Sequence, residues 1–98
     1  MKKVHNVYKS QKLIKVSLEY DEINNTIHSI RIAGDFVLYP EDDLDKLEKD
    51  LIDTKLEKDS IKQRIEKSLI DSATFGFDSE SMTEAILGCV SQQNEFQV

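Results

Sequence analysis

The sequence is poor in the residues that mark several common classes of protein. It holds one cysteine, one proline, three glycines and no tryptophan, so neither a disulfide-stapled scaffold nor a Gly- and Pro-rich linker is expected. No stretch approaches the ~18 consecutive apolar residues that a membrane helix needs, and no hydrophobic segment follows the basic N-terminus as in a signal peptide. We therefore expect a cytoplasmic protein that has no membrane partner.

Positive charge is also scarce. Thirteen Lys and Arg residues stand against nineteen Asp and Glu residues, which gives a formal net charge of −6. Binding to a phosphate backbone depends on clustered Lys and Arg, so this balance argues against a nucleic-acid partner. The length suits one domain over residues 1–98, for which we expect order over about residues 5–90 and a polar tail over residues 91–98.

Alternating hydrophobicity predicts two adjacent strands. Over residues 13–20 every second side chain is apolar: Ile14, Val16, Leu18 and Tyr20. This is the period of a half-buried strand. Residues 21–25 supply turn formers, and residues 26–33 then form the second strand of a hairpin. Residues 35–39 can add a short third strand that ends at Pro40, because proline donates no backbone hydrogen bond.

After Pro40 the apolar period becomes helical and predicts three helices. Their expected apolar stripes are Leu44, Leu47, Leu51 and Ile52; Ile61, Ile65, Leu69 and Ala73; and Met82, Ala85, Ile86 and Cys89. Asp59 or Ser60 is the expected N-cap of the second helix, and Asp78 or Ser79 that of the third. The order of strands followed by helices predicts an α+β fold, in which about three helices pack on one face of an antiparallel hairpin of two to three strands.

The sequence shows no constellation that would catalyse a reaction by itself. It has no phosphate-binding Gly-rich loop, no paired His and Glu at zinc spacing and no nucleophile elbow. Cys89 shares its predicted helix face with Met82 and Ile86, where a buried small hydrophobe is commoner than a reactive thiol. The acidic run over residues 41–50 lacks the ligand spacing and the Gly of an EF-hand. We expect no catalytic residue and no metal site in this chain.

Two short segments are candidates for a functional role, although each also has an ordinary structural explanation. The Gly-Asp-Phe sequence of residues 34–36 ends the hairpin, where a glycine marks a tight bend or a close backbone approach. An aspartate at such a bend can simply bond its own backbone. Lys9 and Lys12 precede the predicted strand, where lysines can reach an anionic ligand such as phosphate or can be plain surface charge.

These segments belong to a longer pattern of motifs. It comprises Tyr8-Lys9, Lys12-Leu13-Ile14, Ile30-Arg31-Ile32-Ala33-Gly34-Asp35-Phe36 and Leu38-Tyr39-Pro40-Glu41, and more weakly Gly76-Phe77-Asp78 and Glu84-Ala85-Ile86. The pattern resembles the C-terminal domain family of lipoate–protein ligases, and the Gly-Asp-Phe sequence with its following Pro-Glu is the most specific part. The chain departs from the family at Gln11, where a Gly is usual, and at Val37, where a second Phe is usual.

The resemblance implies an accessory subunit of a two-subunit ligase. In such systems the catalytic subunit binds lipoate, ATP and Mg, forms lipoyl-AMP and passes the lipoyl group to a lysine of a lipoyl-carrier domain. Few residues precede the first predicted strand, so we expect the catalytic subunit as a separate polypeptide in a heterodimer, and no cofactor on this chain alone. The resemblance places two residues near the adenylate: Lys9 and Lys12. It places four at the partner interface: Gly34, Asp35, Phe36 and Pro40.

Two other interpretations remain open from the sequence. The order of a hairpin followed by helices also resembles the iron–sulfur scaffold and sulfur-acceptor proteins, which need cysteines at the turn after the hairpin to hold a cluster or a persulfide. This chain has none there, and Cys89 lies far along the sequence. The other interpretation is a plain interaction module for some different enzyme. A shared fold would not decide between these functions, because function depends on the site.

Overall fold

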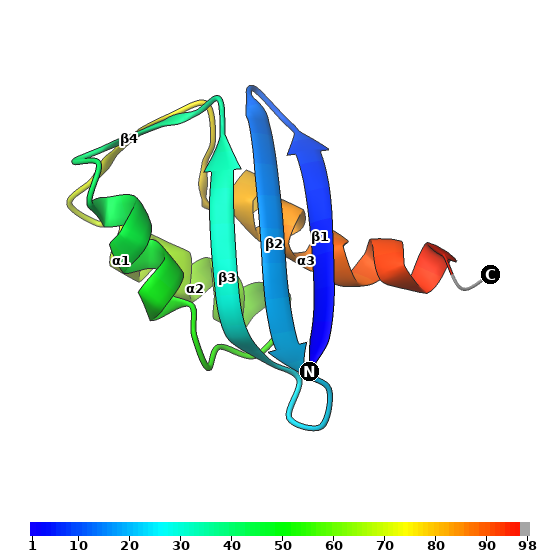
Figure 1. Ribbon diagram of the computed structural model, residues 1–98. Helices are drawn as coiled ribbons and strands as arrows, with labels where there is room; N and C mark the ends of the chain where they lie inside the picture. The colour runs from blue at the N-terminus through cyan, green and yellow to red at the C-terminus, as the bar shows by residue number, and fades with distance from the viewer. Residues whose placement is uncertain (97–98) are drawn as a thin grey trace.

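The computed structural model describes the backbone of residues 1–96 and the side chains of residues 1–90. Its elements follow the chain in this order: β1 (Lys2–Lys9), β2 (Leu13–Asp21), β3 (Thr26–Gly34), β4 (Val37–Tyr39), α1 (Asp43–Asp50), α2 (Lys58–Ser68), β5 (Ala73–Phe75) and α3 (Ser79–Phe96). Strands β1, β2 and β3 form an antiparallel sheet in that order, while β4 pairs with β5 in a separate ribbon. The α+β class with three helices is confirmed (Figure 1).

The β2–β3 hairpin forms over the predicted residues. The alternate residues of β2 that were expected inside are buried, as are Ile27, Ile30 and Ile32 of β3. The spacing of three between Ile27 and Ile30 breaks strict alternation. A register shift beside Tyr20 absorbs it, because a bulge inserts one residue and returns the next side chain to the core face.

Strand β1 completes the sheet and was not predicted. Its inward residues include Asn6, whose polarity hides the period of two in the sequence. The Asn6 side chain is buried and donates a hydrogen bond from Nδ2 to the carbonyl oxygen of Ala85 in α3 at 3.0 Å. A Cβ at Gly88 would lie 2.2 Å from Nδ2 of Asn6, so this glycine makes room for the amide between β1 and α3.

The predicted third strand exists, but its partner lies elsewhere. Val37, Leu38 and Tyr39 of β4 pair with Phe75, Thr74 and Ala73 of β5, and not with the hairpin. The apolar period of the sequence assigns Ala73 to the second helix, but this residue begins β5. The third strand of the main sheet is therefore β1, and the β4–β5 ribbon projects beside it (Figure 1).

The helices bury most of the apolar positions that the sequence assigned to them. Leu47, Leu51, Ile61, Ile65, Met82, Ala85, Ile86 and Cys89 are all buried. Two predicted core residues are wrong: Ile52 follows the end of α1 and is exposed, and Ala73 lies exposed in β5. Helix α2 begins at Lys58 with Glu57 as its N-cap, so the predicted caps Asp59 and Ser60 lie inside its first turn.

Helix α3 begins with the cap that the sequence predicted. Oδ1 of Asp78 accepts a hydrogen bond from the Ser81 N–H at 2.7 Å, and the Asp78 N–H donates to Oγ of Ser81 at 2.9 Å. This reciprocal pair satisfies two backbone donors at the helix start. The hydrogen bonds from Ser81 hold the pKa of Asp78 below its ordinary value.

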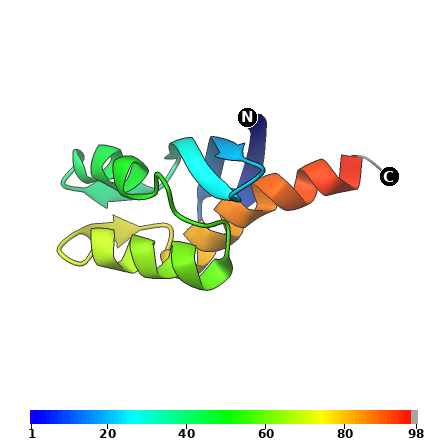
Figure 2. The same ribbon diagram turned by 90° about the horizontal axis from the view of Figure 1, so that it is seen from below.

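The helices leave one face of the sheet open. Figure 1 shows α3 crossing behind the strands, and the view from below in Figure 2 shows α2 and α3 on the same side of the sheet. Helix α3 contacts β1 and β2, α1 contacts β3, and α2 packs on α1 and α3. Over the described residues no helix is long and apolar enough to cross a membrane. The sequence-based limits of the ordered domain stay a prediction, although the α3 backbone is helical to Phe96.

Candidate functional site

The bend after β3 fits closely against the start of β2. The Asp35 N–H donates a hydrogen bond to the Leu13 carbonyl oxygen at 3.0 Å. Gly34 has a φ of +156°, and a Cβ there would lie 2.1 Å from the same Leu13 oxygen. The close backbone approach that the sequence predicted for this glycine is therefore present, and no other residue fits without moving backbone.

A second glycine brings the β1–β2 turn onto this bend. Gly76 has a φ of +94°, and a Cβ there would lie 2.5 Å from Cγ of Lys12 and 3.4 Å from Cα of Phe36. The aliphatic stem of Lys12 thus lies over the Gly76 backbone beside Phe36. The Phe36 ring meets the buried Phe77 edge-on, with ring centroids 4.8 Å apart. This aromatic pair anchors the bend in the core.

The two candidate lysines do not share one side of the sheet. Lys9 is the last residue of β1 and pairs with Leu13 across the turn. By alternation it faces the open side of the sheet with the exposed Lys3, His5 and Val7. Lys12 instead lies over Gly76, on the side of the ribbon. The structure brings Lys12 together with residues 34–36 and separates Lys9 from them.

Pro40 lies at the far end of β4 from the bend. The Tyr39–Pro40 peptide bond is cis, and the Pro40 carbonyl oxygen accepts a hydrogen bond from the Asp43 N–H at 3.0 Å. Pro40 is exposed and turns the chain from β4 into α1. The two positions that depart from the family pattern are also exposed: Gln11 in the β1–β2 turn and Val37 in β4.

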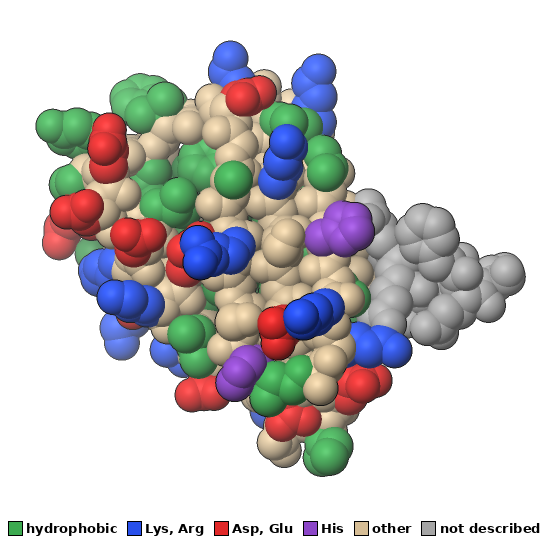
Figure 3. Space-filling view, viewed as in Figure 1, with side chains coloured by type: hydrophobic (Ala, Val, Ile, Leu, Met, Phe, Trp, Pro, Cys, Tyr) green, Lys and Arg blue, Asp and Glu red, His purple; other side chains and the backbone are tan. Residues whose placement is uncertain are grey.

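The outward face of the β4–β5 ribbon is apolar and exposed. The register places Val37 opposite Phe75 and Tyr39 opposite Ala73, so these four side chains share one face. Val37, Tyr39 and Phe75 are 53%, 66% and 64% exposed. Figure 3 shows hydrophobic side chains gathered over β4 at the upper left. This face could not be predicted from the sequence, because neither segment alone indicates that β4 pairs with β5.

Acidic side chains lie at one end of this apolar face, which we call the ribbon face (Val37, Tyr39, Ala73 and Phe75). Glu41 and Asp42 follow β4, and Asp71 precedes β5; all three are exposed. Figure 3 shows acidic side chains beside the hydrophobic group. A surface of this kind suits a partner that offers an apolar patch with basic residues at its rim.

The thiol that sulfur chemistry would require lies inside the core. Cys89 is 1% exposed, and its Sγ lies 3.7 Å from the Val16 carbonyl oxygen. Burial raises the pKa of the Cys89 thiol to about 12, so it stays protonated and unreactive at neutral pH. Among the described residues no three His, Cys, Asp or Glu side chains lie together as metal ligands would.

Two comparisons with known proteins support the same family. A family model described as "Bacterial lipoate protein ligase C-terminus" matches residues 6–87. A search of curated proteins gave no match. Among solved structures, the chain is similar to one from the archaeal lipoylation system of Thermoplasma acidophilum, described as a bi-partite lipoate protein ligase and its E2 lipoyl domain. The identity is 31%, the TM-score is 0.76, and the match covers 87% of this chain and 94% of that one.

Proposed function

Since the chain belongs to the lipoate–protein ligase C-terminal family, we propose that it is the accessory subunit of a two-subunit lipoate–protein ligase. Its partner is then a catalytic subunit that activates lipoate with ATP. The observation that carries this proposal is the match to a chain of a bi-partite ligase, of which this chain covers 94%. The matched protein is described with its E2 lipoyl domain, so we infer that a lipoyl-carrier domain receives the product.

The docking surface that we propose for the catalytic subunit has two continuous parts. The first is the bend, where Gly34 and Asp35 are exposed and Phe36 is half-buried. The second is the ribbon face, which begins one residue later at Val37 and ends beside Pro40. Exposed aromatic side chains at the centre of a surface with polar side chains at its edge are typical of specific interfaces.

The acidic rim favours a different protein over a second copy of this chain. In a dimer built on the ribbon face, each copy would bring the exposed Glu41, Asp42 and Asp71, and a net charge of −6, to the same interface. Like charges at an interface disfavour association. A partner with lysines or arginines around an apolar patch avoids this repulsion, and the overall charge of −6 points the same way.

For the chemistry, we propose that Lys12 brings positive charge to the activation step. In that step a lipoate carboxylate oxygen bonds to the α-phosphorus of ATP, the bond to the leaving pyrophosphate breaks, and lipoyl-AMP forms. Negative charge concentrates on the phosphate oxygens, and a fixed cation close to them lowers the barrier. Lys12 suits this role better than Lys9, because its stem is held over Gly76 beside the proposed docking surface.

A comparison of the two half-reactions tests the proposal. The catalytic subunit is assayed with its carrier protein under four conditions: lipoate with ATP or supplied lipoyl-AMP, each with and without this chain. Mass measurement of the carrier reports lipoylation. We expect transfer from lipoyl-AMP without this chain, and transfer from lipoate and ATP only when it is added. Equal dependence of both half-reactions would indicate a general stabilising partner, and no dependence in either would refute the accessory role.

A further inference from the structure

A wide groove separates α1 from α2 and lies outside the proposed docking surface. It has a volume of about 760 Å³ and is lined by residues of α1, α2 and the segment between them: Lys46, Asp50, Asp53, Thr54, Lys55, Ser60, Gln63, Arg64, Lys67 and Ser68. None of these residues belongs to the bend or to the β4–β5 ribbon. The volume is in the range of ligand-binding pockets.

The groove gathers positive charge in an otherwise acidic protein. Four of its lining residues are cationic, against two carboxylates. Among the described residues, the side chains of Lys55, Arg64 and Lys67 have no hydrogen-bond or ion-pair partner. Lysines on the neighbouring face of α2 are paired, since Lys58 and Lys62 lie 3.3 Å and 3.1 Å from Glu80. The groove-facing cations therefore lack the carboxylate partners that α3 provides on the other face.

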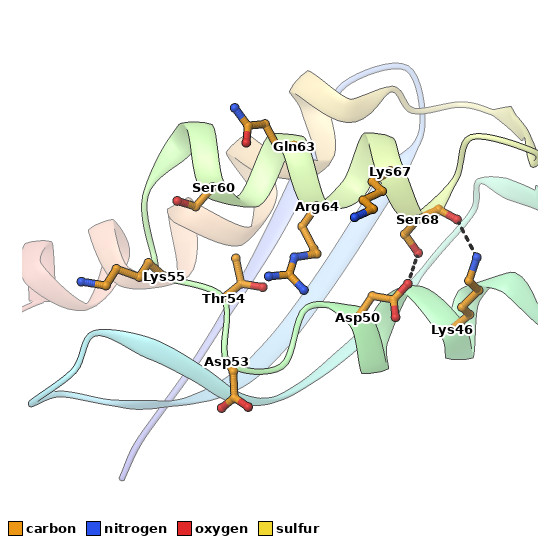
Figure 4. A pocket seen from close by; sticks show the side chains of 10 residues that line it. All are labelled: Lys46, Asp50, Asp53, Thr54, Lys55, Ser60, Gln63, Arg64, Lys67 and Ser68. Carbon is orange, nitrogen blue, oxygen red and sulfur yellow. Dashed lines mark hydrogen bonds between the residues drawn. The ribbon is translucent and has the colours of Figure 1, made fainter.

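The two carboxylates of the groove are hydrogen-bonded within its wall or turned away from its hollow. Asp50 accepts a hydrogen bond from Oγ of Ser68 at 2.8 Å, and Nζ of Lys46 donates to the Ser68 carbonyl oxygen at 3.2 Å. Asp50 is thus engaged within the wall of the groove. Figure 4 shows Asp53 pointing away from the hollow, while Arg64 extends from α2 toward the segment that holds Thr54.

The floor of the groove holds an unsatisfied polar group. Thr54 is 3% exposed, and its Oγ1 has no hydrogen-bond partner among the described residues. The backbone around it is fixed, because the Thr54 carbonyl accepts from the Ile27 N–H at 3.0 Å and its own N–H donates to Leu51 at 3.2 Å. A buried unpaired hydroxyl is unfavourable, and a ligand oxygen that enters the groove can satisfy it.

The donors are distributed along the groove and do not converge on one point. Ser60, Gln63, Arg64 and Lys67 follow one face of α2. The rise along the helix from the first of these to the last is about 10 Å. Figure 4 shows Lys55 and Lys46 at opposite ends. A single phosphate group cannot reach all of these donors at once, whereas an extended peptide of three to four residues covers that length.

From this distribution we propose that the α1–α2 groove binds an extended acidic segment of a partner protein. Carboxylates of the segment meet Arg64, Lys67 and the terminal lysines, and one oxygen accepts a hydrogen bond from the Thr54 hydroxyl. Arginine is suited to this role because its guanidinium binds a carboxylate with two parallel hydrogen bonds. The proposal is independent of the accessory function, since it uses other residues and another chemistry.

A short peptide titration tests the groove directly. The ¹⁵N-labelled full chain is titrated at low salt with a blocked tetraglutamate peptide, and a blocked tetraglutamine peptide serves as the uncharged control. We expect tetraglutamate to move the backbone amide signals around Lys46, Thr54, Arg64 and Lys67 and tetraglutamine to leave them in place. Because salt screens the attraction between exposed charges, about 0.5 M salt should abolish these changes in the amide signals.

Two matched pairs of substitutions in α2 distinguish binding in the groove from general electrostatic attraction to the protein. Arg64→Gln with Lys67→Gln removes two groove cations, while Lys58→Gln with Lys62→Gln removes two cations that face Glu80. We expect the first pair to weaken tetraglutamate binding about tenfold and the second to change it less than about twofold. Thr54→Val should also weaken binding, with the chain still folded by circular dichroism.

Three results would overturn the proposal. The first is equal weakening by both variant pairs, which would mean unspecific attraction. The second is the absence of amide shifts along α1 and α2 at millimolar peptide. The third is displacement of the peptide by inorganic phosphate or pyrophosphate at lower concentration, which would identify a site for a small anion. None of these results bears on ligase activation, so this proposal and the accessory role can fail separately.

Discussion

Replacement of Phe75 by alanine should weaken binding of the catalytic subunit without unfolding the protein. The ring is 64% exposed on the ribbon face, opposite Val37. Because most of the ring has no contact within this chain, Phe75→Ala should lower the free energy of unfolding by less than about 1 kcal/mol. The buried neighbour Phe77 differs, since truncation of a buried phenylalanine costs about 3–5 kcal/mol.

The expected loss of affinity follows from the area that docking can cover. An aromatic side chain buries roughly 150–250 Å², so the exposed part of Phe75 offers about 130 Å². At ~25 cal/mol per Å², complete coverage contributes ~3 kcal/mol, about a hundredfold in Kd. If docking covers half of the exposed ring, the change in Kd is about tenfold. We therefore expect Phe75→Ala to raise the Kd by about 10- to 100-fold.

Isothermal titration of the catalytic subunit into each variant gives this Kd. Ile23→Ala is the matched control, because Ile23 is 93% exposed in the β2–β3 turn, at the opposite end of the sheet from the ribbon (Figure 1). It should leave the Kd unchanged. If Phe75→Ala and the double variant with Val37→Ser both bind as the wild type does, the ribbon face is not the docking surface.

Four further outcomes are expected. Lys12→Ala should slow lipoate-dependent ATP–pyrophosphate exchange by about 10- to 100-fold with complex formation intact; a wild-type rate would make Lys12 plain surface charge. Gly34→Ala should destabilise the fold by about 2 kcal/mol or more in urea unfolding, because its Cβ would meet the Leu13 carbonyl oxygen. Thr54→Val should leave stability unchanged or raise it, since the hydroxyl has no partner; a loss above about 1 kcal/mol would reveal a hydrogen bond. Cys89→Ala should cost about 1 kcal/mol at neutral pH and leave activity intact. Because burial raises the pKa of the Cys89 thiol from 9.0 to about 12, only the unfolded thiol ionises between those pH values. The wild type should therefore lose stability relative to Cys89→Ala as pH rises from 9 to 12, and a constant difference in urea unfolding would contradict the buried thiol.

The sequence predicted those elements whose apolar period is regular. The β2 strand and α3 were found because their buried residues follow periods of two and of three to four. Strand β1 was missed because its inward Asn6 is polar, and its hydrogen bond to Ala85 lies 79 residues away in sequence. The end of α2 was overestimated because Ala73 continues the period of four, although it belongs to β5.

The sequence predicted the parts of the candidate site that a single residue type indicates. Gly34 stood out by its type and position, and the structure gives the physical reason in the Leu13 carbonyl oxygen. The proximity of Lys12 to Gly76 joins segments 64 residues apart, and no local pattern encodes it. For the same reason Lys9 and Lys12 appeared equivalent in sequence, although they face different sides of the sheet.

The central claim is that this chain enables a separate catalytic subunit to activate lipoate. The most direct measurement is lipoate-dependent exchange of labelled pyrophosphate into ATP, with the catalytic subunit alone, this chain alone and the two mixed in equal amounts. We expect exchange above background only in the mixture, saturating at one copy of this chain per catalytic subunit. Full exchange by the catalytic subunit alone, unchanged when this chain is added, would contradict the claim.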